Sequence, residues 1–168
     1  LLKLPSILAD CVIAYLIYKI ANKRMNKNWI LFVMAIWLFN PMVLLDSACW
    51  GQVDSILALA ILLAAYYIEK EKYTYSAIAL AFAITLKPQG IFFVPILGYA
   101  LLNQLIKEKD IPLTKRLLRF AYSIVAFFAT AMIIILPFGI KMEGNIFSWI
   151  LNVYVNTAGG YSYATVNS

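Results

Sequence analysis

Long apolar runs, separated by short charged segments, dominate the chain. The first covers residues 4–20, which at about 1.5 Å per helical residue is roughly 26 Å, close to the hydrocarbon thickness of a bilayer. The pattern predicts an all-α, polytopic transmembrane helical bundle in a single domain, 1–168, with about six spanning or partly spanning helices. We expect these helices at 4–20, 29–45, 55–68, 75–86, 91–106 and 117–138, followed by a tail at 139–168.

Polar and helix-breaking residues interrupt this pattern at three places. Asn40 and Pro41 fall late in the second run, so that helix is expected to end or kink there. A polar insert follows at 46–55. Residues 75–86 would rise only about 18 Å as a helix, so this run is expected to span partway or to bend at the LKPQG hinge of 86–90.

Composition supports the membrane interpretation and excludes several protein classes. The chain is 64% hydrophobic and 13% charged, whereas soluble domains are about 45 to 50% apolar and about 25% charged. It has no histidine, and Cys11 and Cys49 lie in separate apolar contexts, so no zinc site and no His-based general base is expected. We therefore exclude a soluble enzyme, a secreted disulfide scaffold and, despite the net charge of +6, a nucleic-acid partner.

The basic residues are distributed asymmetrically. Connectors at 19–28, 69–74 and 107–119 hold 11 of the 14 Lys and Arg residues. If the helices alternate across the bilayer, these connectors share one side, which the positive-inside rule makes cytoplasmic. The other side, predicted to be extracytoplasmic, receives the unusual polar residues: Asp10, Asp46, Gln52, Asp54, Lys87, Gln89 and the Asn- and Tyr-rich tail.

Lys87 and the carboxylate pair of Asp46 and Asp54 indicate a binding site. An ionisable residue at mid-membrane depth costs roughly 2.5 to 3.5 kcal/mol and usually faces a bundle interior. Lys87, beside Pro88, is a candidate phosphate contact, with a snorkelling lysine as the alternative. Asp46 and Asp54 flank Trp50, a mixture of carboxylates and aromatic surface typical of carbohydrate sites; alternatively, Asp54 only caps the next helix.

Four sequence elements together resemble membrane-embedded glycosyltransferases of the GT-C superfamily. They are NPMVLLDSACWGQVDS at 40–55, LKPQGIFFVP at 86–95, KLPSILAD at 3–10 and YSYATVN at 161–167. The strongest resemblance is to bacterial relatives of the second mannosyltransferase of GPI-anchor assembly. It implies an integral multi-pass protein of the bacterial plasma membrane and cell envelope. Such a protein transfers a sugar, mannose first among the candidates, from a polyprenyl-phosphate-linked donor to a glycan, lipid or protein acceptor outside.

The resemblance also assigns roles to residues. It places Lys87 and Gln89 near the lipid phosphate, and Trp50, Gln52 and Asp54 near the sugar. Asp54 and Asp46 are the candidate catalytic residues, and no metal or cofactor is expected. The candidate substrate-binding residues are Asp10, Trp50, Gln52, Lys87, Gln89, Tyr161 and Asn167.

The catalytic carboxylate of such enzymes lies upstream of the segment resembling KLPSILAD, so we expect the chain to be an internal fragment. Two alternatives remain open. A lipid or sugar transporter or flippase would also have broken helices and charged residues at mid-membrane depth. A non-catalytic GT-C-like scaffold subunit would use the same residues for assembly or lipid recognition rather than for sugar transfer.

Overall fold

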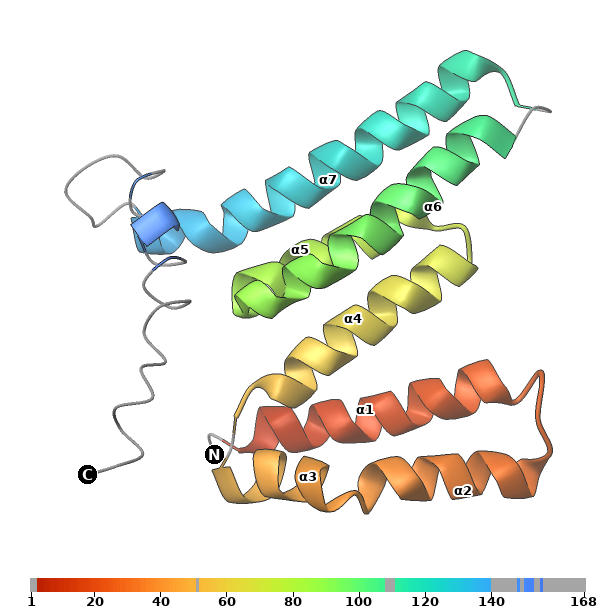
Figure 1. Cartoon of the computed structure of the whole chain (residues 1–168), viewed down its shortest axis with the longest axis vertical. Helices are drawn as coiled ribbons and strands as arrows, with labels where there is room; N and C mark the ends of the chain where they lie inside the picture. The colour runs from red at the N-terminus through yellow and green to blue at the C-terminus, as the bar shows by residue number, and fades with distance from the viewer. Residues whose placement is uncertain are drawn as a thin grey trace.

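The computed structural model describes residues 3–50, 52–107, 111–139, 148, 150–152 and 155, and all regular structure in this part of the chain is helical. Each of the six expected helices has a counterpart, so the predicted all-α bundle is confirmed (Figure 1). The elements are α1 (Leu4–Ala21), α2 (Lys27–Leu38), α3 (Pro41–Leu44), η1 (Leu45–Trp50), α4 (Asp54–Glu69), α5 (Tyr73–Leu86), η2 (Pro88–Phe93), α6 (Val94–Lys107) and α7 (Leu113–Gly139).

The second predicted helix is broken where the sequence has Asn40 and Pro41. Helix α2 ends at Leu38, and the side chain of Asn40 accepts a hydrogen bond of 2.9 Å from the backbone N–H of Met42, which caps α3. The chain bends by 44° at this break. The predicted kink is therefore confirmed, whereas the prediction of one helix over 29–45 is wrong.

A π-helical turn, η1, follows α3 and occupies the first part of the polar insert that the sequence predicted at 46–55. A backbone hydrogen bond connects this turn to the segment that follows it: the N–H of Gln52 donates to the carbonyl of Asp46 at 3.1 Å. π-Helical turns are rare and are frequently found at functional sites. This one directs residues 45–50 toward the starts of α1 and α4.

Small residues bring α4 and α5 close together in the centre of the bundle. Ser76, Ala77, Leu80 and Ala81 of α5 are buried, and the hydroxyl of Ser76 donates to the carbonyl of Ala64 in α4 at 2.8 Å. Small side chains let helix backbones approach closely in membrane proteins, where packing and interhelical hydrogen bonds replace the hydrophobic effect. Helix α5 also contacts α7, so it forms the middle of the described bundle.

The predicted hinge after α5 is a change of helix type. Lys87 is extended, and Pro88 opens the 3-10 helix η2, which leads directly into α6. Gly90 packs tightly against α5, since a Cβ at this position would lie 2.9 Å from the backbone nitrogen of Ile84. The hinge thus requires glycine because two backbones meet there.

Three helical stretches of the described residues are long and apolar enough to cross a membrane: Leu4–Ala21, Pro88–Ile106 and Leu113–Phe138. The bent pair Lys27–Leu38 and Pro41–Trp50 would make a fourth. The helix Tyr73–Leu86 is also apolar but shorter. Large apolar side chains also cover the outside of the bundle, as Phe39, Phe92 and Ile133 are 70% exposed or more. The chain is therefore a polytopic membrane protein.

Candidate functional site

An ion pair joins α4 and α5 where the first begins and the second ends. Asp54 is the first residue of α4 and Lys87 follows the last residue of α5, so the antiparallel hairpin brings them together. The Lys87 Nζ donates to Asp54 Oδ1, and the two side chains are 23% and 42% exposed. The helix cap before α4 is Val53 and has no side-chain hydrogen bond, so the prediction that Asp54 caps this helix is wrong.

Asp46 adds a second carboxylate to the ion pair. It lies on η1 and is partly buried, and its charge interacts with those of Asp54, Lys87 and Asp10. Its Oδ2 is fully buried and has no hydrogen-bond partner among the described residues. An unpaired buried acceptor is costly, so this oxygen would be stabilised by a hydrogen bond from a ligand hydroxyl or an ordered water.

Asp10 of α1 adds a third carboxylate, which is only 7% exposed. Its Oδ1 also lacks a hydrogen-bond partner within the described part of the chain. Asp10 was a candidate substrate-binding residue, and Lys87 pairs with Asp54 rather than with it. The Oδ1 of Asp10 therefore remains an open acceptor in the described structure.

Hydrogen bonds from serine side chains hold α1, η1 and α4 together. The hydroxyl of Ser6 in α1 donates to the carbonyl of Gln52, and the hydroxyls of Ser47 in η1 and Ser55 in α4 are 2.7 Å apart. Lys3 reinforces the same junction by donating from Nζ to the carbonyl of Cys49 at 2.9 Å. Sequence reasoning missed the serines as parts of the site; the only signal was their position at the starts of helices.

The remaining candidate residues are either exposed or lie outside the residues that the structure describes. The side chains of Trp50, Gln52 and Gln89 are exposed, Trp50 by 68%, and none makes a side-chain hydrogen bond that links it to the carboxylates in the described structure. Tyr161 and Asn167 lie outside the described residues. The structure therefore brings together Asp10, Asp46, Asp54 and Lys87, which we call the charged cluster.

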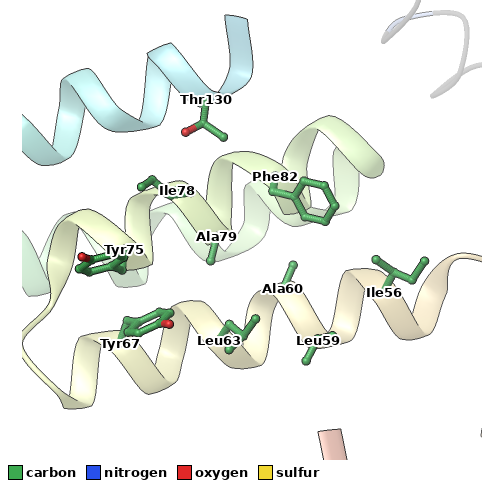
Figure 2. Close-up of a pocket in the computed structure, with 10 residues that line it drawn as sticks. All are labelled: Ile56, Leu59, Ala60, Leu63, Tyr67, Tyr75, Ile78, Ala79, Phe82 and Thr130. Carbon is green, nitrogen blue, oxygen red and sulfur yellow. The ribbon is translucent and has the colours of Figure 1, made fainter. Parts of the chain in front are cut away.

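A groove lined mainly by apolar residues runs along α4 and α5 (Figure 2), and Ile56 at one end of it follows Asp54 by two residues in α4. It has a volume of about 350 Å³ and extends from Tyr67 and Tyr75 at one end to Ile56 and Phe82 at the other. Thr130 of α7 faces it, with its hydroxyl bonded to the carbonyl of Ala126 in its own helix. The arrangement of a charged head site and an apolar groove fits an amphiphile.

The charged cluster is rich in hydrogen-bond acceptors, because it contains three carboxylates and a single ammonium group, that of Lys87. Carboxylates accept hydrogen bonds from hydroxyl groups, and an ammonium group binds phosphate as a point charge. Within the described residues, no group of three or more Asp, Glu, Cys or His side chains is arranged to hold a metal ion. The cluster therefore suits a polar ligand that carries hydroxyl groups.

Comparison with known proteins places the chain among proteins named for GPI-anchor metabolism. Residues 1–160 match the family described as GPI transamidase subunit PIG-U. GPI mannosyltransferase 1 of Saccharomyces cerevisiae is 28% identical over 103 residues, covering 61% of this chain and 25% of that protein. The Candida albicans protein of the same name is 31% identical over 105 residues, covering 61% of this chain and 26% of that protein. No solved structure matches.

The chain thus spans about a quarter of the length of these relatives. The expected relation to GPI mannosyltransferases is found, although with the first enzyme of that name rather than the second. These relatives come from yeasts, so the comparisons give no support to a bacterial plasma membrane, a cell envelope role or a polyprenyl-phosphate donor. Because the family match covers residues 1–160, the chain belongs to the PIG-U family, and it is a multi-pass membrane protein.

Proposed function

We propose that this protein recognises a lipid-linked saccharide of the GPI type, with the charged cluster binding its polar head. The observation that carries the proposal is the pair of unpartnered, buried carboxylate oxygens on Asp10 and Asp46 beside the Lys87–Asp54 ion pair. Neither oxygen has a hydrogen-bond partner among the described residues, so each would gain a hydrogen bond from a sugar hydroxyl that reached it. Family membership supports a glycolipid ligand rather than a free sugar.

The ligand's other parts match the neighbouring features. Lys87 can contact a phosphate, since its ammonium group is partly exposed and held at the end of α5 by the Asp54 carboxylate. The groove of Figure 2 can take up a lipid chain, because its lining from Ile56 to Tyr75 is almost entirely apolar. One ligand would thus contact the cluster and the groove at once.

In this proposal the chain is the lipid-recognising part of a larger assembly. The family is named for a subunit of GPI transamidase, and a subunit of such an enzyme can present the glycolipid to a catalytic partner. This is the scaffold alternative that the sequence left open, and the family match supports it. It assigns the carboxylates to binding and leaves the chemistry to another chain.

Sugar transfer is the second candidate, and the similarity to GPI mannosyltransferase 1 favours it. An acceptor hydroxyl oxygen would attack the anomeric carbon of a mannosyl polyprenyl phosphate and form the new glycosidic bond. The bond from that carbon to the phosphate oxygen would break, and polyprenyl phosphate would leave with the electron pair beside Lys87. Asp46, rather than Asp54, would take the acceptor proton, because Asp54 is engaged by Lys87.

One experiment separates the two functions. The protein is assayed in membranes with a fluorescent GPI-type glycolipid and, in parallel, with radiolabelled polyprenyl-phosphate mannose. The variants are Asp46→Asn and Lys87→Ala, with Glu71→Gln as a matched control, since Glu71 is an exposed carboxylate in the turn between α4 and α5.

We expect wild type and Glu71→Gln to bind the glycolipid and the two cluster variants to bind it at least about tenfold more weakly, the effect of losing about 1.4 kcal/mol. Label transfer that depends on Asp46 would establish the second candidate. Binding that is unchanged in Asp46→Asn and Lys87→Ala would refute the assignment of the site, and no binding of either ligand would refute the function.

A further inference from the structure

We propose that the end of the bundle opposite the charged cluster binds the headgroup of an anionic glycerophospholipid. The site is a cavity between the ends of α1 and α4, lined by Lys19, Lys23, Arg24, Tyr66, Glu69 and Lys70, among others. It is separate from the charged cluster, which lies at the starts of α1 and α4, so the inference does not depend on the proposed function. In Figure 1 the two ends lie on opposite sides of the bundle.

Side-chain contacts connect most of the charged residues that line the cavity. Arg24, just beyond α1, pairs with Glu69 at the end of α4 at 2.7 Å and fixes the two helix ends together. Lys19 and Lys70 both lie over the ring of Tyr66, with Nζ 5.5 and 5.6 Å from its centre. Cation–π contacts of this kind hold both ammonium groups beside the cavity.

The charge of the cavity is strongly positive. Four cationic side chains line it, and Glu69, which is bonded to Arg24, is the only carboxylate among the lining residues. Lys19, Lys23 and Lys70 make no ion pair with any carboxylate in the described structure. The volume of about 210 Å³ would hold about seven waters at roughly 30 Å³ each, which is enough for a phosphate group.

The position of the cavity indicates a lipid rather than a soluble anion. Helix α1 is long and apolar enough to cross a membrane, so the residues that follow Ala21 lie at the membrane surface. Tyr67 and Tyr75, whose ring centres are 5.4 Å apart, belong to the same end of the bundle, as expected of aromatic side chains at a membrane interface. Basic pockets between transmembrane helices at this level bind anionic headgroups.

Helix α1 also carries exposed apolar and aromatic side chains before the cavity-lining residue Lys19. Val12, Tyr15 and Tyr18 of α1 are 43%, 59% and 39% exposed. Val12 and Tyr15 precede Lys19 by seven and four residues, so these three side chains lie along one side of the helix. A glycerophospholipid could therefore contact this side of α1 with a chain while its phosphate occupies the cavity.

The test measures lipid binding to the whole protein by native mass spectrometry, with phosphatidylglycerol and phosphatidylcholine as probes. The variant Lys19→Gln/Lys23→Gln removes two charges from the cavity. The control Lys72→Gln/Lys115→Gln removes two exposed charges that do not line it. Each basic residue near an anionic surface contributes about 1 kcal/mol, so the cavity variant should bind phosphatidylglycerol roughly 30-fold more weakly.

The control should bind phosphatidylglycerol within about twofold of wild type, because neither Lys72 nor Lys115 lines the cavity that holds the headgroup. The single variant Lys23→Ala, which lies beyond the end of α1, keeps the test valid if the double variant fails to fold. Three results would each overturn the proposal. These are equal binding of phosphatidylcholine, an equal loss in the control, and displacement of the lipid by an equimolar amount of inorganic phosphate, which would indicate a site for soluble anions.

Discussion

The Lys87–Asp54 ion pair gives a quantitative prediction about the charged cluster. Both side chains are partly exposed, at 23% and 42%, so solvent screens the pair and its contribution lies between two limits. Exposed pairs contribute about 0.2 to 1 kcal/mol, whereas breaking a buried pair costs about 3 to 5 kcal/mol. We expect a coupling free energy of about 1 to 2 kcal/mol between these two residues.

A double-mutant cycle measures this coupling. Lys87→Met and Asp54→Asn are made singly and together, and the free energy of unfolding is determined for each in detergent micelles. The losses of unfolding free energy in the two single variants should add up to more than the loss in the double variant. The reason is that Lys87→Met alone leaves the Asp54 carboxylate without its partner.

The control cycle pairs Lys87→Met with Glu71→Gln. Glu71 lies in the turn at the other end of α5, so the two substitutions should add to within about 0.5 kcal/mol. A coupling between Lys87 and Asp54 that is also below about 0.5 kcal/mol would refute the ion pair as a structural feature of the site. The role proposed for Lys87 as a positioned phosphate contact would then have no support.

The remaining predictions concern the backbone and the packing around α5. Gly90→Ala should destabilise the protein by about 1 to 3 kcal/mol, because the new Cβ would meet backbone atoms of α5, whereas Gly98→Ala, which meets nothing within 4 Å, should be neutral or stabilising in the same thermal-melting assay. Ser76→Ala should cost about 1 kcal/mol in the free energy of unfolding through loss of the bond to the carbonyl of Ala64, and an unchanged value would show that this bond contributes nothing. Glu71→Gly should raise the melting temperature, because Glu71 has a φ of 56° that glycine adopts without strain, and a lower melting temperature would contradict this.

The sequence was most informative about the helices, because the bilayer fixes how long an apolar run must be. Residues 4–20 and 55–68 were predicted to within a residue or two of α1 and α4. Pro41 and Pro88 marked the two breaks correctly, since proline removes a backbone donor wherever it stands. The last helix begins earlier than expected, at Leu113, because its basic first turn reads as connector in a hydropathy pattern.

The charged cluster was only partly predictable. The asymmetry of basic residues correctly placed Asp10, Asp46, Asp54 and Lys87 at one end of the bundle. It gave no information on which of them would pair, because that depends on how α5 returns along α4 over 33 residues of sequence. The π-helical turn η1 was also beyond reach, since its polar residues have the composition of a loop.

The shortness of the central hairpin has a consequence for the surrounding lipid. At about 1.5 Å per residue, the 16 residues of α4 and the 14 of α5 measure roughly 24 and 21 Å, against about 30 Å for a bilayer's hydrocarbon core. If the turn at 70–72 lies level with one membrane surface, the Lys87–Asp54 pair lies some 6 to 9 Å below the other. Around this hairpin the bilayer must thin or water must enter, and a hydrophilic headgroup would reach the carboxylates by descending into that depression.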